Sequence, residues 1–239
     1  MSNPLTVIVP CAGAGTRLGL PMPKELLPIG AGRVAIDGVF DLVRAARTPT
    51  RVVLVVDDHR VATLAHVHHR HRDVPVAAVR QRAESPELAG ALESALEWAN
   101  ERILVLLPDQ VLSAPPPNFL LDDVLAALER APACVLAAHE DDPARIAMDG
   151  ALCVDDTMRG QRVCHLVDKP GTDAAEQGRF NAVWFGLAFR REAAQQVIDQ
   201  LAEATEPPLG GAPVIEVPPF TDLGTWPSLL RYWKDLPCA

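Results

Sequence analysis

The residues best suited to chemistry lie within the first 30 positions, where an apolar, β-branched run leads into a glycine turn. Residues 5–10 are followed by Cys-Ala-Gly-Ala-Gly-Thr-Arg at 11–17, and Lys24 stands seven positions after Arg17. The backbone amides of such a turn can face phosphate oxygens, and Arg17 adds a charge-assisted donor. We therefore predict that this segment holds a polyphosphate.

Lysine is scarce in this chain, which makes Lys24 informative. The sequence has 22 Lys and Arg residues, but only Lys24, Lys169 and Lys234 are lysines. A compact ammonium and a planar guanidinium are not interchangeable at a tight phosphate site. The lysine at 24 therefore indicates a position that needs a point charge.

Two better-known phosphate-binding turns do not fit the segment. A P-loop needs Gly-x-x-x-x-Gly-Lys-Ser/Thr, which does not occur, and a dinucleotide fingerprint needs a third glycine where this chain has Leu18. An ordinary glycine-rich turn with one surface arginine remains the alternative for this string taken alone.

Composition narrows the class of protein. A chain of 239 residues, 49% hydrophobic, can bury a full core. Its net charge of −9 argues against a nucleic-acid polymer as partner. No apolar run approaches the ~18 residues of a membrane span, and the N-terminus lacks the basic start of a secretory signal. The five cysteines, with no Cys-x-x-Cys pair, are expected to be free thiols in a cytoplasmic protein.

The elements that must position the turn alternate between strand-like and helical patterns. Strands are expected at 5–10, 51–56, 74–80, 102–107 and 133–139, with helices at 37–47, 59–71, 86–100 and 119–131. This alternation predicts an α/β fold with a doubly wound, mostly parallel, Rossmann-like mixed sheet and helices on both faces. Strands at 145–154, 162–168 and 180–189 predict a small antiparallel insertion, followed by a helix at 190–203 and a last helix from Trp226.

Five motifs, in order along residues 8–225, resemble the sugar-1-phosphate nucleotidyltransferases, above all the bacterial UTP:glucose-1-phosphate uridylyltransferases and the glucose-1-phosphate thymidylyltransferases. The first comprises the turn at 12–18 together with Pro-Lys-Glu-Leu-Leu-Pro at 23–28. The others are Leu-Pro-Asp at 107–109, Val-Asp-Lys-Pro at 167–170, the segment 181–189, and Thr-Asp-Leu-Gly-Thr at 221–225.

The resemblance implies the reaction and a role for each site residue. An acceptor phosphate attacks the α-phosphorus of a nucleoside triphosphate, and pyrophosphate leaves. Arg17 and Lys24 would bind the triphosphate, Lys169 the acceptor phosphate, and Asp109 and Asp222 one Mg²⁺. We further predict nucleotide contacts at Ala12, Gly13, Ala14, Gly15, Thr16, Gln81 and Glu87, and acceptor contacts at Asp168, Asn181 and Gly186.

We interpret residues 1–239 as one nucleotidyltransferase domain, with a nucleotide-binding half at 1–140, an acceptor-binding half at 141–225 and a C-terminal helix at 226–239. The sequence departs from the family at Glu87, where a glycine is expected, and around the acceptor. The sequence therefore leaves open which triphosphate and which acceptor are used, and whether the protein forms a homo-oligomer. The expected acceptor is a sugar-1-phosphate or a related phosphate or phosphonate, and a cytidylyltransferase acting on a non-sugar phosphate or phosphonate is one alternative. A non-catalytic sensor of nucleotides or sugar phosphates is the alternative class.

Two further features favour structural roles. His66, His68, His69 and His71 form a tract that resembles metal ligands, but their spacing favours a solvated helix face. Trp226 and Trp233, seven residues apart, are expected to anchor the last helix to the core.

Overall fold

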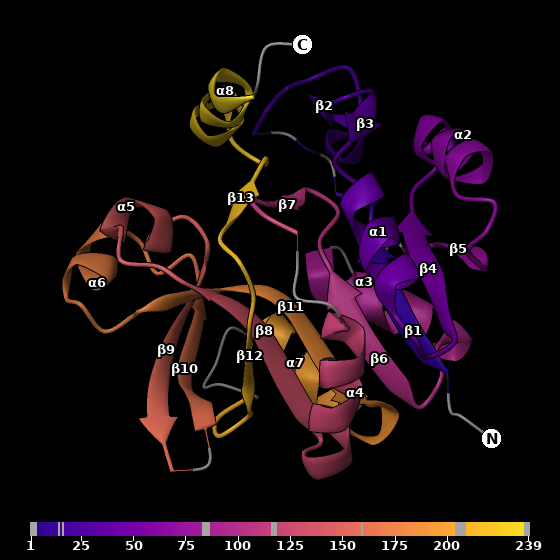
Figure 1. Cartoon of the computed structure of the whole chain (residues 1–239). Coiled ribbons are helices and arrows are strands. Elements are labelled where there is room, and N and C mark those ends of the chain that lie inside the picture. Colours follow the sequence, from indigo (N-terminus) through magenta and orange to yellow (C-terminus); the bar gives the residue numbers. More distant parts are fainter. Residues whose placement is uncertain are drawn as a thin grey trace.

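The fold is that of a computed structural model of the chain, in which a mixed sheet carries helices on both faces (Figure 1). The structure describes residues 4–13, 15, 17–82, 87–115, 119–158, 160–203 and 209–236. Within them the sheet has nine strands, in the order β10-β9-β11-β6-β1-β4-β5, with β8 beside β11 and β12 beside β8.

Four strands form the parallel core of the sheet. They are β1 (Leu5–Pro10), β4 (Thr50–Val56), β5 (Val76–Arg80) and β6 (Arg102–Leu106). Strands of this kind are buried on both faces, which explains why their sequences are continuous apolar runs. The first strand lies between β4 and β6, so the turn that follows it emerges at the middle of the sheet.

The second half of the chain adds the antiparallel part. The pivot is β11 (Ala182–Arg190), which runs antiparallel to β6 on one edge and to β8 on the other. The remaining strands of this part are β8 (Ala133–His139), β9 (Gly150–Thr157), β10 (Gly160–Asp168) and β12 (Val214–Glu216). The expected doubly wound sheet with an antiparallel insertion is confirmed.

Helices cover both faces through separate apolar cores. One core joins a face of the sheet to α1 (Asp37–Ala45), α2 (Val61–Arg70) and α4 (Leu120–Arg130). The other joins the opposite face to α3 (Glu87–Ala95) and α7 (Ala194–Glu203). Short 3₁₀ turns, η2 (Leu96–Trp98) and η3 (Arg191–Ala193), follow α3 and precede α7.

Small elements at the carboxyl ends of the parallel strands complete the structure. They are η1 (Lys24–Leu26), the pair β2 (Pro28–Gly30) and β3 (Arg33–Val34), the pair β7 (Gln110–Leu112) and β13 (Phe220–Asp222), and the helices α5 (Pro143–Ile146), α6 (Thr172–Glu176) and α8 (Trp226–Asp235). Figure 1 shows β7 and β13 side by side between the sheet and α8.

Three local predictions are wrong. The strand expected from 145 begins only at Gly150, because Asp142 caps the short helix α5, accepting a hydrogen bond from the Ala144 amide at 2.9 Å. The helix expected at 86–100 ends at Ala95 and continues as η2. Trp226 is 41% exposed and does not anchor α8, whereas Trp233 donates its indole N–H to the carbonyl of Pro28 at 2.8 Å.

Candidate active site

A cavity of about 360 Å³ opens where β1 and β6 end and the β7–β13 pair begins. Ligands of open α/β sheets bind at this edge. Eight residues singled out from the sequence line the cavity: Gly13, Gly15, Arg17, Lys24, Glu87, Asp109, Lys169 and Asp222. They come from five separate stretches of the chain, so the fold brings together what the motifs predicted.

The centre of the cavity is a cluster of one lysine and two aspartates. Lys24 Nζ lies 2.6 Å from Asp109 Oδ2. Asp109 is buried, and its Oδ1 has no hydrogen-bond partner among the described residues. Burial acts to lower the pKa of Lys24, but the Asp109 carboxylate outweighs it, so the pKa is raised and the ammonium is charged.

Asp222 reaches this cluster through strand pairing. In the antiparallel β7–β13 pair Asp222 stands opposite Gln110, and the Leu223 amide donates to the Asp109 carbonyl at 2.9 Å. Burial, and next the charge of Asp109, raise the pKa of Asp222 from 3.8 to about 7. Two mutually repelling carboxylates, one with an unpartnered oxygen, suit a divalent cation with oxygen ligands.

Gly224 permits the close packing of this cluster. Its amide donates to Asp222 Oδ1 at 2.6 Å. A Cβ atom at position 224 would lie 2.7 Å from that oxygen and 3.4 Å from Asp109 Oδ2. Only glycine lets the backbone approach the two carboxylates this closely.

The glycine turn forms the wall beside Lys24. The amide of Cys11 continues the sheet by donating to the Val55 carbonyl at 2.7 Å. The chain then turns at Gly15, whose φ of +61° lies in the region that favours glycine. Arg17 is exposed at the rim of the cavity. Of the predicted nucleotide contacts, Ala14 and Thr16 lie outside the described residues, and Ala12 does not line the cavity.

Glu87 lines the cavity at the start of α3, in an unusual conformation. Its φ is +69°, which an L side chain rarely adopts, and its carbonyl accepts a hydrogen bond from the Gln81 amide at 3.0 Å. Gln81 itself does not line the cavity. The left-handed backbone gives a physical reason for the glycine that the family pattern has at this position.

The opposite wall comes from the second half of the chain. Lys169 is exposed in a loop after β10, and its amide donates to the Asp149 carbonyl at 3.0 Å. Trp184 is buried against the backbone of Gly150, where an added Cβ would lie 1.7 Å from the indole nitrogen. Burial raises the pKa of Asp149, although Arg145 lies 3.8 Å away as a counter-ion.

Of the three predicted acceptor contacts, two lie outside the cavity lining, and the side chain of the third is outside the described part of the structure. Asn181 bonds through its side-chain amide to both backbone groups of Val154, at 2.8 and 2.9 Å, and does not line the cavity. Gly186 is buried in β11, where a Cβ would come within 2.9 Å of the Leu106 side chain. Asp168 ends β10 opposite Gly150, and its side chain lies outside the described part. Their contact with an acceptor stays a prediction.

Sequence reasoning assigned no role to the other half of the cavity wall, although four of its residues stand within the family motifs. This half comprises Leu18, Leu107, Gln110, Met148, Asp149, Gly150, Trp184 and Gly224. The Gln110 side-chain amide donates to the Trp184 carbonyl at 3.3 Å, and its buried Oε1 has no hydrogen-bond partner in the described part of the chain. Its place directly after Asp109 in the sequence was the one available signal.

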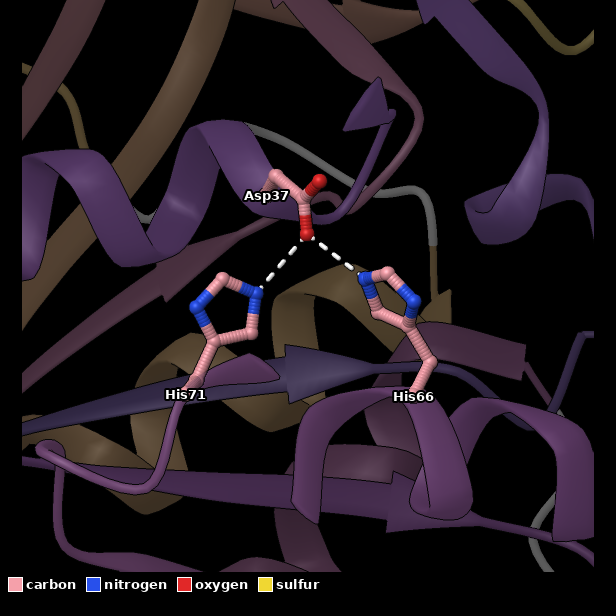
Figure 2. Close-up of side chains that lie close together, drawn as sticks. All are labelled: Asp37, His66 and His71. Atoms are coloured by element: carbon pink, nitrogen blue, oxygen red, sulfur yellow. Dashed lines mark hydrogen bonds and ion pairs between the residues drawn. The ribbon is translucent and has the colours of Figure 1, made fainter. Parts of the chain in front are cut away.

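The histidine tract is not the solvated face that its spacing suggested. His68 and His69 are exposed, but the Nε2 atoms of His66 and His71 each lie 2.7 Å from Asp37 Oδ1 (Figure 2). His71 follows the last residue of α2, so helical periodicity does not govern where its ring points. These residues lie outside the cavity lining.

Comparison with known proteins agrees with this geometry. Residues 7–214 match the model of the MobA-like NTP transferase domain. The bifunctional protein GlmU of Azorhizobium caulinodans is 33% identical over 140 residues, which are 58% of this chain and 30% of that protein. The chain thus spans under a third of the length of this relative.

Solved structures share the fold at low identity. A Bacillus anthracis protein, provisionally assigned as a glucose-1-phosphate thymidylyltransferase and solved with a sucrose, superposes with a TM-score of 0.73 at 18% identity, covering 98% of this chain and 97% of that one. Two structures of Acinetobacter baumannii UDP-glucose pyrophosphorylase, one bound to UTP, give TM-scores of 0.70 and 0.69 at 18% identity, covering 95% of this chain and 91% of theirs.

No helix in the described part of the chain is long and apolar enough to cross a membrane. The family match covers most of the sequence, including the glycine turn, Lys24, Asp109 and Lys169. The chain therefore belongs to the family of MobA-like NTP transferase domains, and it is a nucleotidyltransferase.

Proposed function

We propose that the protein transfers a nucleoside monophosphate from a nucleoside triphosphate to a phosphorylated small molecule, with a sugar-1-phosphate as the first candidate acceptor. The observation that carries this proposal is the placement of Lys24 and Lys169 in the lining of one cavity around Asp109 and Asp222. Two anions that repel each other need cations on both sides and a carboxylate pair for a metal between them.

In this reaction an oxygen of the acceptor phosphate bonds to the α-phosphorus, and the bond from the α-phosphorus to the bridging oxygen breaks. The electron pair leaves with pyrophosphate. No general base is needed, because a phosphate monoester with a second pKa of ~6 is mostly dianionic at neutral pH. The task of the protein is to position the reactants and neutralise their charge.

The residues divide between the two reactants. The amides of the glycine turn, including Gly13 and Gly15, and the side chains of Arg17 and Lys24 would hold the triphosphate and stabilise the departing pyrophosphate. Lys169 would hold the acceptor phosphate. The lining draws on residues before 140 for the first group and after 140 for Lys169 and Trp184, which supports a nucleotide-binding half and an acceptor-binding half.

Asp109 and Asp222 would hold a divalent cation, for which we propose Mg²⁺. The fit rests on the unpartnered, buried Oδ1 of Asp109 and on the raised pKa of Asp222, both of which indicate a site short of positive charge. When bound, the cation would neutralise charge on the triphosphate.

The names of the structural neighbours guide the choice of acceptor. One carries glucose-1-phosphate in its name, and another is bound to UTP. Pyrophosphate release should therefore be measured with Mg²⁺ for each nucleoside triphosphate against sugar-1-phosphates, other phosphate monoesters and phosphonates. Turnover that needs both substrates would support the proposal. Triphosphate binding without turnover for every pair would refute it in favour of a sensor.

A further inference from the structure

The face of α2 that packs against the molecule is polar at both ends. At its start, Arg60 and Thr63 meet the buried carboxylate of Glu25. At its end, His66 and His71 meet the buried carboxylate of Asp37 (Figure 2). Both acidic residues belong to the segment 24–37, which carries Lys24. Two buried clusters therefore clamp this segment onto α2.

The cluster at Asp37 has the donor types of a metal site, but its hydrogen bonds argue against one. Arg44 Nη2 lies 2.9 Å from His71 Nδ1. A guanidinium can only donate, so Nδ1 accepts and the ring proton sits on Nε2, facing Asp37. A metal on Nε2 would move that proton to Nδ1, against the guanidinium. The cluster is a structural clamp that links α1 to α2.

The cluster at Glu25 differs because it also contacts the glycine turn. Arg60 Nε donates to the Cys11 carbonyl at 2.5 Å, and Nη2 donates to the Gly13 carbonyl. The same Nε lies 3.2 Å from Glu25 Oε1. Arg60 is the one buried arginine among the described residues, with 8% of its surface exposed.

These contacts fix the direction of the turn's peptide groups. In a trans peptide the carbonyl and the following N–H point in opposite directions, and no cis peptide occurs in the described chain. With the Cys11 carbonyl held by Arg60, the Ala12 amide points away from the guanidinium. The fork of Arg60 thus holds the Cys11 and Gly13 carbonyls and leaves the Ala12 amide to face away from it.

The same guanidinium fixes the neighbour of Lys24. Glu25 is fully buried, accepts a hydrogen bond from Thr63 Oγ1 at 2.8 Å, and has a second oxygen, Oε2, without a described partner. Burial raises the pKa of Glu25, and this rise is opposed by hydrogen bonds from its own backbone and from Thr63 and by the charges of Arg60 and Lys24. Arg60 therefore connects the glycine turn to the Lys24 segment.

We infer that Arg60 is a positioning residue for the triphosphate. By contacting the Cys11 and Gly13 carbonyls and the Glu25 carboxylate, it fixes the position of the turn amides relative to Lys24. The inference rests on the proposed function. Each nitrogen of the Arg60 guanidinium donates to a protein acceptor, namely the Cys11 carbonyl, Asp57 Oδ1 at 3.4 Å and the Gly13 carbonyl, so the role does not require contact with the ligand.

Two variants test this role. Arg60→Lys keeps a positive charge for Glu25 but loses the fork that reaches two carbonyls. The double variant R60M/E25Q removes both charges, so no uncompensated carboxylate is left buried. The matched control is Asp37→Asn, which weakens the other clamp on the same helix without touching the turn. Each protein is assayed for the Kd of the preferred triphosphate, for both KM values and for its Tm.

For Arg60→Lys we expect the Kd and KM of the triphosphate to rise by about tenfold or more, the scale of one hydrogen bond to a charged group. The KM of the acceptor should not change, and R60M/E25Q should show the same split. Asp37→Asn should lower Tm and leave both KM values unchanged. Unchanged triphosphate binding in both Arg60 variants, or equal rises in both KM values, would overturn this inference but not the proposed function. A wild-type protein that binds no triphosphate would overturn the proposed function with it.

Discussion

Replacing Asp222 by asparagine should stabilise the metal-free protein at alkaline pH while it abolishes turnover. Burial and the neighbouring Asp109 raise the pKa of Asp222 to about 7 in the folded chain, against 3.8 ordinarily. The folded state therefore holds this proton more tightly than the unfolded state. The stability that the proton confers is full below pH ~4 and is lost as the pH rises through ~7.

The size of the effect follows from the two pKa values. The interval from 3.8 to about 7, at ~1.4 kcal/mol per pH unit, corresponds to about 4 kcal/mol in the free energy of unfolding. Asparagine keeps an oxygen for the Gly224 amide but no longer attracts Lys24, so we expect about half of this, ~2 kcal/mol. For a chain of this length that is a Tm higher by about 4–8 °C.

The assay is thermal unfolding of wild type and Asp222→Asn with a chelator present, across a pH series from ~3.5 to ~8.5. The variant should match wild type below pH ~4, exceed it increasingly as the pH rises from ~4 to ~7, and keep a constant advantage above pH ~7. Added Mg²⁺ should then stabilise wild type more than the variant, because ligand binding to the folded state adds to its stability. Turnover of the variant should fall by at least about a hundredfold.

The control is Asp235→Asn, at an exposed position at the end of α8. Removing this charge should change Tm little and equally at all pH values. A Tm difference between Asp222→Asn and wild type that is constant with pH would refute the reasoning, because the stabilisation would not come from the titration of Asp222. Retained turnover in the variant would show that Asp222 is not a metal ligand.

Three further substitutions have distinct expected outcomes. Lys169→Met should raise the KM of the acceptor while the Kd of the triphosphate, measured by calorimetry, stays the same; a loss confined to triphosphate affinity would contradict its assignment. Glu87→Gly should relieve the backbone strain at φ +69° and raise the free energy of unfolding by about 1 kcal/mol in urea titrations; a loss of stability would show that the Glu87 side chain stabilises the fold. Gly150→Ala should displace the Trp184 indole, since a Cβ would lie 1.7 Å from the indole nitrogen, and should weaken acceptor use more than triphosphate binding. Unaltered acceptor kinetics would show that this wall does not contact the acceptor.

The parts of the fold that were predicted from sequence depend on local patterns. The apolar run before the glycine turn and the alternation of strands and helices each follow from residues close in the chain. Asp109 was named from the family motif Leu-Pro-Asp at the end of a strand, and the structure places it in the cavity lining. The helix at Pro143–Ile146 was missed although Asp142 before a proline is a helix-start signal, because the neighbouring residues also suit a strand.

The missed part of the site depends on pairing between distant segments. Gln110 and Asp222 meet because β7 pairs with β13, more than a hundred residues later. Trp184 lies on Gly150 because β9 and β11 are neighbours in the sheet. The partners of His66 and His71 were equally hidden, since Asp37 comes from another helix. No periodicity within one segment carries this information.

The two walls of the cavity are held in different ways, and this separates reaction type from acceptor choice. The side proposed for the triphosphate consists of backbone amides and charged groups, and Arg60 donates hydrogen bonds to two carbonyls of its turn. The acceptor side is held by packing: the Trp184 ring lies on Gly150, and the Trp184 carbonyl accepts from the Gln110 amide at 3.3 Å. The hydrogen bond holds the backbone of Trp184, and close packing on Gly150 holds its ring, so this wall has a defined shape. We therefore propose that the acceptor is selected by the shape of its body against Trp184, while its phosphate would bind Lys169. Changes at this wall should alter which acceptor is used without altering how the phosphoryl groups react.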